Sequence, residues 1–100
     1  MNKNTIKQVE QLLIELDIDC DPSLDYLSKY FSAFNKISEE GSSVVIKTDG
    51  ARAAKEKFTV VISGGELGDD IFFRNDGESL QELMSDAIVF YNDEVWEFDI

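Results

Sequence analysis

The middle third of the chain contains two runs of β-branched and aromatic residues, and these runs restrict the possible folds more than any other feature. Val44-Val45-Ile46 forms the first run and Phe58–Ile62 the second. Such side chains pack well on a pleated sheet and lose rotamer freedom in a helix. A third run, Ile71–Arg74, follows a segment rich in glycine. The short links between the runs predict a three-stranded antiparallel meander and argue against a wholly helical fold.

Helical periodicity precedes this middle third. Apolar residues recur at intervals of three and four over Ile6–Leu16, and Thr5 with Gln8 has the spacing of a capping box ahead of them. Asp21 offers an N-cap for a second helix, with Pro22 at the first helical position, where a missing N–H costs nothing. This second helix is expected to end near Gly41.

A third helix and a short final strand are predicted after the meander. Ser79 and Glu82 make a second capping box, and the apolar stripe that follows it ends at Asn92-Asp93. Beyond that point apolar and acidic residues alternate with period two, which predicts a strand at a sheet edge; the residues are Trp96, Glu97, Phe98, Asp99 and Ile100.

These elements together predict a single α+β domain that spans residues 1–100, with the order ααβββα(β). Each amphipathic helix must bury its apolar stripe, and the meander has one apolar face to offer. The expected packing is therefore a two-layer arrangement of an antiparallel sheet against helices.

The charge of the chain is strongly acidic and unevenly distributed. Twenty-one Asp and Glu residues stand against nine Lys and Arg, giving a net charge of −12. Residues 66–100 contain eleven acids and one arginine, whereas residues 42–65 contain four basic residues and two acids. A field of this sign repels nucleic acid and anionic membranes and speeds association with basic partners. We therefore expect a basic protein as partner, with no direct contact to nucleic acid or membrane.

The predicted partner-binding residues are acids of the last third. They are Glu66, Asp69, Asp70, Asp76, Glu78, Glu82 and Asp86, with Asp93, Glu94 and Glu97 as a continuation. An interface also needs a desolvated centre, which aromatic residues often supply. We expect Phe98 and one of Phe72 and Phe73 to be buried, and the other of those two, Tyr91 or Trp96 to be partly exposed within the acidic surface.

No motif for catalysis accompanies the charge. The chain has no histidine, and its lone Cys20 lies among aspartates whose negative field disfavours a thiolate. Asp69, Asp70 and Asp76 are the best candidates for a metal-dependent hydrolase, but Arg74 is the only basic residue after Gly65 to hold an anionic substrate. The sequence predicts a protein that is not an enzyme and that has no cofactor or metal, with a small metal-dependent hydrolase as an alternative.

The predicted function is that of a small acidic, protein-binding inhibitor. The leading interpretation is an immunity protein that neutralises a cognate basic nuclease-type toxin by blocking its active or substrate-binding surface. An alternative is a phage-encoded DNA mimic that inhibits a CRISPR effector or restriction enzyme. The N-terminus shows no apolar run of the length of a signal peptide or a membrane span, so a cytoplasmic location is expected.

Overall fold

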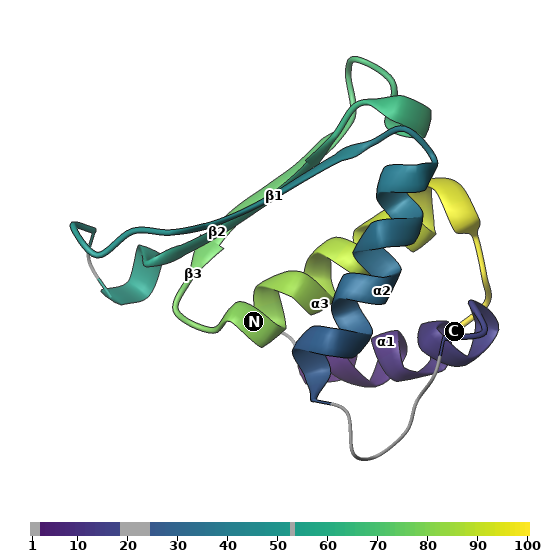
Figure 1. Cartoon of the computed structure of the whole chain (residues 1–100), viewed down its shortest axis with the longest axis horizontal. Coiled ribbons are helices and arrows are strands. Elements are labelled where there is room, and N and C mark those ends of the chain that lie inside the picture. The colour runs from purple at the N-terminus through teal and green to yellow at the C-terminus, as the bar shows by residue number, and fades with distance from the viewer. Residues whose placement is uncertain (1–2, 19–24, 53) are drawn as a thin grey trace.

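The computed structural model describes residues 3–18, 25–52 and 54–100 (Figure 1). The regular elements are α1 (Lys3–Glu15), α2 (Tyr26–Glu39), β1 (Ser43–Thr48), β2 (Phe58–Ser63), β3 (Phe72–Gly77) and α3 (Leu80–Tyr91). Two short 3₁₀ turns, η1 (Ala54–Glu56) and η2 (Gly65–Leu67), lie in the connections between strands, and a π-helical turn, η3 (Asn92–Trp96), follows α3. The order ααβββα confirms the predicted α+β class.

The sheet is the predicted antiparallel meander, with strand order β1-β2-β3. Its helix-facing side carries alternate apolar residues such as Val60 and Ile62, which are fully buried. The helices all lie on this one side of the sheet (Figure 1). The other side is open to solvent, and Val45 on β1 and Phe72 on β3 remain 52% and 60% exposed there.

Helix α3 is the centre of the packing. It contacts β2 and β3 on one side, α2 beside it, and α1 on the side away from the sheet (Figure 1). Helix α2 covers β1. The buried core accordingly combines all of these elements, including Val9, Leu12, Leu13, Tyr30, Phe34, Ile37, Val60, Ile62, Leu83, Met84, Ile88 and Tyr91.

The ends of the first two helices differ from the predictions in detail. Helix α1 begins at Lys3, so Thr5 lies inside the helix and the predicted capping box there is wrong. Helix α2 begins at Tyr26, with Asp25 as its N-cap: the Asp25 carboxylate accepts a hydrogen bond of 2.9 Å from the Ser28 N–H. The predicted cap at Asp21 and Pro22, and Cys20, lie outside the described residues.

Helix α2 ends close to the predicted glycine. Gly41 adopts a positive φ of 102°, and the Ser42 N–H reaches back to the Ile37 carbonyl at 3.4 Å. A left-handed residue with a six-to-one backbone bond is the usual way of ending a helix at glycine. The turn leads the chain directly into β1.

The predicted final strand over residues 96–100 is wrong. The chain continues from α3 into η3, and residues 97–100 have no regular structure. The Asn92 side chain explains this: its amide N–H donates to the Phe98 carbonyl at 3.0 Å, and its oxygen accepts from the Phe98 N–H at 2.9 Å. One side-chain amide thus satisfies the backbone groups that a neighbouring strand would otherwise bind.

Candidate functional site

The acidic loop between β2 and β3 is held tightly against the turn that follows α2. The Ser42 hydroxyl donates to the Gly64 carbonyl at 2.8 Å. Gly65 has a positive φ of 58°, and a Cβ placed on it would lie 2.5 Å from the Gly41 carbonyl carbon. Leu67 is buried beneath the loop. The loop therefore has a fixed position from which Glu66, Asp69 and Asp70 extend into solvent.

The π-helical turn η3 lies next to this loop. Contacts between η2 and η3 bring the two segments together although more than 20 residues separate them in the chain. Asp93 and Glu94 on η3 are exposed, as is Glu97 at its end. We define the acidic end as these six exposed acids: Glu66, Asp69, Asp70, Asp93, Glu94 and Glu97.

The other four predicted site residues lie elsewhere. Asp76 is near the far end of β3, Glu78 and Glu82 are at the start of α3, and Asp86 is half-buried in the middle of α3. Helix α3 has 12 residues, so about 18 Å separates its two ends. The ten acids thus form two separate groups. Only in the acidic end are all the residues exposed and carried by adjacent segments.

Asp76 is bound by neighbouring side chains on the open side of the sheet. Its carboxylate accepts hydrogen bonds from the Thr59 hydroxyl and from Arg52 Nη1, the latter at 3.3 Å. Arg52 also pairs with Glu56 at 3.3 Å. The Thr59 hydroxyl, and after it the Arg52 guanidinium, hold the pKa of Asp76 below its ordinary value. One cation of the basic β1–β2 connection is therefore neutralised on the open side of the sheet.

Replacing Asp76 with asparagine is expected to lower the urea midpoint at pH 7, since the Arg52 pair and the charge-assisted bond from Thr59 are lost. A carboxyl group whose pKa is lowered by folding stabilises the protein above its unfolded value of 3.8, and this contribution is lost as the pH falls through the folded value. The difference between Asp76→Asn and the wild type should therefore shrink in acid. Urea unfolding at pH 7 and at pH 3 measures both midpoints, and the exposed Glu78→Gln is the matched control. An undiminished difference at pH 3 would contradict the role of the carboxylate charge.

The aromatic residues follow the predictions in part. Phe72 is exposed, whereas Phe73 packs against Phe90 with ring centroids 5.6 Å apart. Trp96 and Phe98 are half-buried, so Phe98 is less buried than predicted. Tyr91 is fully buried and cannot serve as a surface anchor. Ile71, beside Phe72, is also 42% exposed. The acidic loop therefore leads directly into two exposed apolar side chains.

Glu40 binds the π-helical turn that carries part of the acidic end, and the sequence did not indicate this role. Its carboxylate accepts a 2.7 Å bond from the Tyr91 hydroxyl and bonds of 2.9 and 3.1 Å from the Trp96 indole N–H. Burial, and after it the Glu40 carboxylate, raise the pKa of Tyr91 to about 12. These bonds fix η3 against the end of α2. They depend on residues more than 50 positions apart, and no local pattern marks them.

The carboxylates proposed for a metal-dependent hydrolase do not converge. Asp69 and Asp70 precede β3 and Asp76 lies near its end, about 15–20 Å away along an extended strand. Among residues 3–18, 25–52 and 54–100, no three acidic or cysteine side chains are grouped so that they could hold a metal ion. Asp69, Asp70 and Asp76 are therefore not placed to hold one metal ion together.

Comparison of the chain with protein-family models, with curated proteins and with solved structures finds no match in any of the three. None of the helices in the described part of the chain has the length and apolar character needed to cross a bilayer.

Proposed function

We propose that this chain is an acidic inhibitor that binds a basic protein through the acidic end, and that it is an immunity protein directed at a nuclease-type toxin. One observation carries the proposal: exposed Asp69 and Asp70 lead directly into exposed Ile71 and Phe72. Charge and apolar surface are thus adjacent on a loop whose position is fixed.

The two parts of this surface have separate physical roles. The acids attract a basic partner over a distance of about a Debye length and raise the rate of encounter. Once the surfaces meet, Phe72 supplies apolar area that loses its water, which slows dissociation. A contact of about 800 Å² on each partner is common for stable complexes. It would use only a small part of the 5978 Å² surface of this chain.

The grouping of the acids supports an inhibitor with one compact contact surface. A DNA mimic must align carboxylates in rows that resemble two phosphate backbones. Here six exposed acids come from one loop and one π-helical turn, while the remaining predicted residues lie at the other end of α3 or are half-buried. The immunity interpretation is therefore the better supported of the two.

The test is to capture the partner from the native host and then to measure association kinetics with the purified partner. A variant with Asp69→Lys and Asp70→Lys is expected to associate about tenfold more slowly at low salt, because steering is lost. The matched control carries Glu15→Lys and Glu78→Lys, which change the net charge equally at exposed sites outside the acidic end. Phe72→Ala should mainly raise the dissociation rate.

Two results would contradict the proposal. The first is an equal fall in association rate for the acidic-end variant and the control, which would assign steering to the net charge alone. The second is a captured partner that is acidic, or one whose nuclease activity is unchanged by saturating amounts of this chain.

A further inference from the structure

The outer edge of β1 is unpaired, and its backbone groups have a defined direction. In the described sheet, β1 pairs with β2 alone, and Thr48 is matched with Phe58. The Asp49 N–H donates to the Lys57 carbonyl at 2.9 Å, which makes this next pair a hydrogen-bonded one. Bonded and non-bonded pairs alternate along an antiparallel ladder. The odd-numbered residues of β1 therefore bond to β2, and the even-numbered ones point their N–H and C=O groups outward: Val44, Ile46 and Thr48.

The edge of β3 on the other side of the sheet is protected, whereas the β1 edge is not. The same alternation pairs even-numbered β2 residues with odd-numbered β3 residues, so Arg74 and Asp76 point their backbone groups outward. Both are charged, and the Asp76 N–H is already bound by the Asn75 side-chain oxygen at 3.0 Å. The only charged residue of β1 is Lys47, and its ammonium lies 3.7 Å from the Asp49 carboxylate. An edge without protection is a template for another strand.

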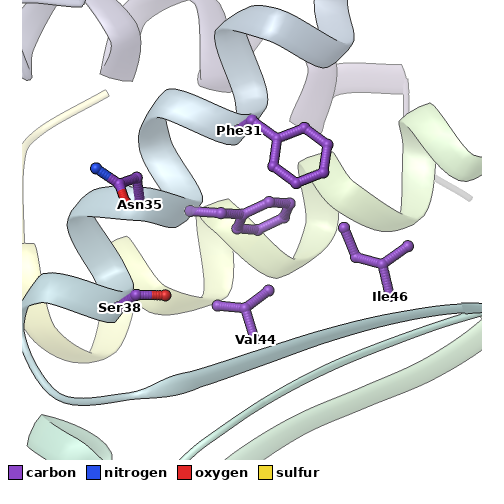
Figure 2. A pocket seen from close by; sticks show the side chains of 6 residues that line it. Phe31, Asn35, Ser38, Val44 and Ile46 are labelled. Carbon is purple, nitrogen blue, oxygen red and sulfur yellow. The ribbon is translucent and has the colours of Figure 1, made fainter.

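A groove with apolar side chains accompanies the unpaired edge. It lies between β1 and α2, has a volume of about 370 Å³, and includes Phe31, Phe34, Val44 and Ile46 in its lining. Figure 2 shows Phe31 on α2 above Val44 and Ile46 on β1, with the space between them. Phe31 remains 56% exposed, and Val44 and Ile46 are only half-buried. A strand added to β1 would therefore cover apolar side chains that the single chain leaves in contact with water.

The charge on this side of the molecule favours a second copy of the chain as the occupant. Residues 26–49 comprise α2, β1 and the turn between them, and they contain three lysines and three acids, so their net charge is zero. The whole chain carries −12. Contact between two copies through the acidic end would oppose two sets of like charges, whereas contact through β1 and α2 opposes neutral surfaces.

Two copies of β1 match each other in an antiparallel register that uses every outward group. With a two-fold axis at Ile46, this residue pairs with its own copy, and Val44 pairs with Thr48 of the second copy on both sides of the axis. All three residues are then in bonded pairs, which exchange both N–H and C=O groups. The non-bonded pairs between them match Val45 with Lys47 of the second copy. No two charges of the same sign are directly opposite in this register.

The neighbouring registers are poorer. An axis at Lys47 would place two lysines directly opposite each other, which is unfavourable in a sheet. An axis at Val45 would match Thr48 with Ser42, but the Ser42 N–H already reaches the Ile37 carbonyl at 3.4 Å. The register centred on Ile46 therefore satisfies more backbone groups than either.

The register centred on Ile46 also matches charge at the ends of the joined sheet. The start of β1 in one copy lies beside the end of β1 in the other. The acidic loop, which Ser42 holds at the start of β1, is thus at the same end as the basic β1–β2 connection of the second copy. The two Ser42 residues lie about 26 Å apart along the strand direction. This distance exceeds a Debye length of about 10 Å, so the two acidic loops repel each other weakly.

We propose that the chain forms a two-fold dimer through antiparallel pairing of β1 with β1 of a second copy, centred on Ile46. The two three-stranded sheets join into one continuous sheet. Because the axis is perpendicular to this sheet, the helices of both copies lie on the same side, and the two grooves adjoin across Val44 and Ile46. The acidic ends lie at opposite ends of the dimer. The proposal does not depend on the function proposed for the acidic end.

The first test uses the purified chain alone. Sedimentation equilibrium at rising concentration should give the mass of two chains. Hydrogen exchange followed by NMR should show the amides of Val44, Ile46 and Thr48 exchanging at least tenfold more slowly in the dimer than in dilute solution. The amides of Val45 and Lys47 already bond to β2 in the register above, so their exchange should change little. A chain that stays monomeric, or a dimer without protection of the outward amides, overturns the proposal.

Two substitutions at one exposed position test the pairing with opposite signs. Val45 is 52% exposed on the open side of the sheet and faces Lys47 of the second copy in the proposed register. Val45→Glu gives two attractive cross-strand pairs per dimer and Val45→Lys two repulsive ones, so the dimer Kd should be about tenfold lower for the first variant than for the second. Net charge alone predicts the reverse order, because Val45→Lys makes the chain less negative and Val45→Glu makes it more negative.

The matched controls are Gln11→Glu and Gln11→Lys. Gln11 is exposed on α1, which packs on the side of α3 away from the sheet. These variants change the net charge equally and should show only its effect, with the glutamate form dimerising no more tightly than the lysine form. If the two Val45 variants follow the same order as the controls, Val45 does not face Lys47 and the proposed pairing is wrong.

The register has a separate signature in NMR. The Cα atoms of a non-bonded pair lie about 4.5 Å apart, which brings their α-protons together. A mixture of labelled and unlabelled chains should therefore give an intermolecular NOE between the α-protons of Val45 and Lys47. An intermolecular NOE between the α-protons of two Val45 residues would overturn the pairing centred on Ile46.

Discussion

Replacing Gly65 with alanine is expected to lower the free energy of unfolding by about 3 kcal/mol. Two causes act together. Gly65 has a φ of 58°, where a side chain costs about 1–2 kcal/mol. Its Cβ would also lie 2.5 Å from the Gly41 carbonyl carbon and the Ser42 nitrogen, and backbone atoms cannot rotate out of the way as a side chain does. The loop and the end of α2 must then move apart. Urea unfolding monitored by circular dichroism measures the change.

Two further glycines separate these causes. Gly68 has a φ of 76°, but a Cβ there would meet nothing within 4 Å, so Gly68→Ala should show the cost of the backbone conformation alone. Gly50 has open space and no positive φ, and Gly50→Ala should change stability by less than about 0.5 kcal/mol. If Gly65→Ala is no more destabilising than Gly68→Ala, the contact with Gly41 is not what requires glycine.

The wild-type protein is expected to lose on the order of 2 kcal/mol of stability between pH 10 and pH 12 through Tyr91. Burial and the Glu40 carboxylate raise the pKa of Tyr91 from 10.0 to about 12. The neutral phenol is therefore favoured in the folded state, and its contribution is complete below pH 10. It is lost as the pH rises through the folded pKa, because the phenolate then faces the Glu40 carboxylate at a partly buried contact.

Tyr91→Phe isolates this contribution. At pH 8 the variant should be less stable than the wild type by about 1–2 kcal/mol, because the 2.7 Å bond to Glu40 is lost. The variant has no phenol at this position to ionise, so the two stability curves should converge between pH 10 and pH 12. If the urea midpoints of the two proteins instead change in parallel with pH across that range, the ionisation of Tyr91 does not affect the stability of the fold.

The parts of the fold that local chemistry determines were predictable. Ser79 caps α3 as its spacing with Glu82 indicates, and its hydroxyl accepts from the Glu82 N–H at 3.4 Å. The β-branched runs form strands because they have one helix-facing apolar side. The predicted final strand is wrong because of a side-chain contact: alternation at residues 96–100 fits a strand, but the amide of Asn92, six residues before Phe98, binds the Phe98 backbone.

The candidate site was predictable in charge and not in arrangement. The uneven distribution of charge indicated an acidic surface formed by residues after Gly65. The sequence also predicted that Asp69, Asp70 and Asp76 belong to one site. Only the tertiary structure separates them, since β3 carries Asp76 to the end of the sheet where Arg52 and Thr59 bind it. The tie between Glu40 and Tyr91 depends likewise on how α2 and α3 pack.

The packing of α1 on α3 has a consequence for synthesis on the ribosome. Val9, Leu12 and Leu13 form the apolar stripe of α1, and α1 packs chiefly against α3, which ends at Tyr91. At about 5–20 residues per second, roughly 4–16 s pass between translation of the stripe and completion of the helix that covers it. During that interval the apolar stripe of α1 has no cover, and transiently exposed apolar surface of this kind makes an incomplete chain prone to aggregation.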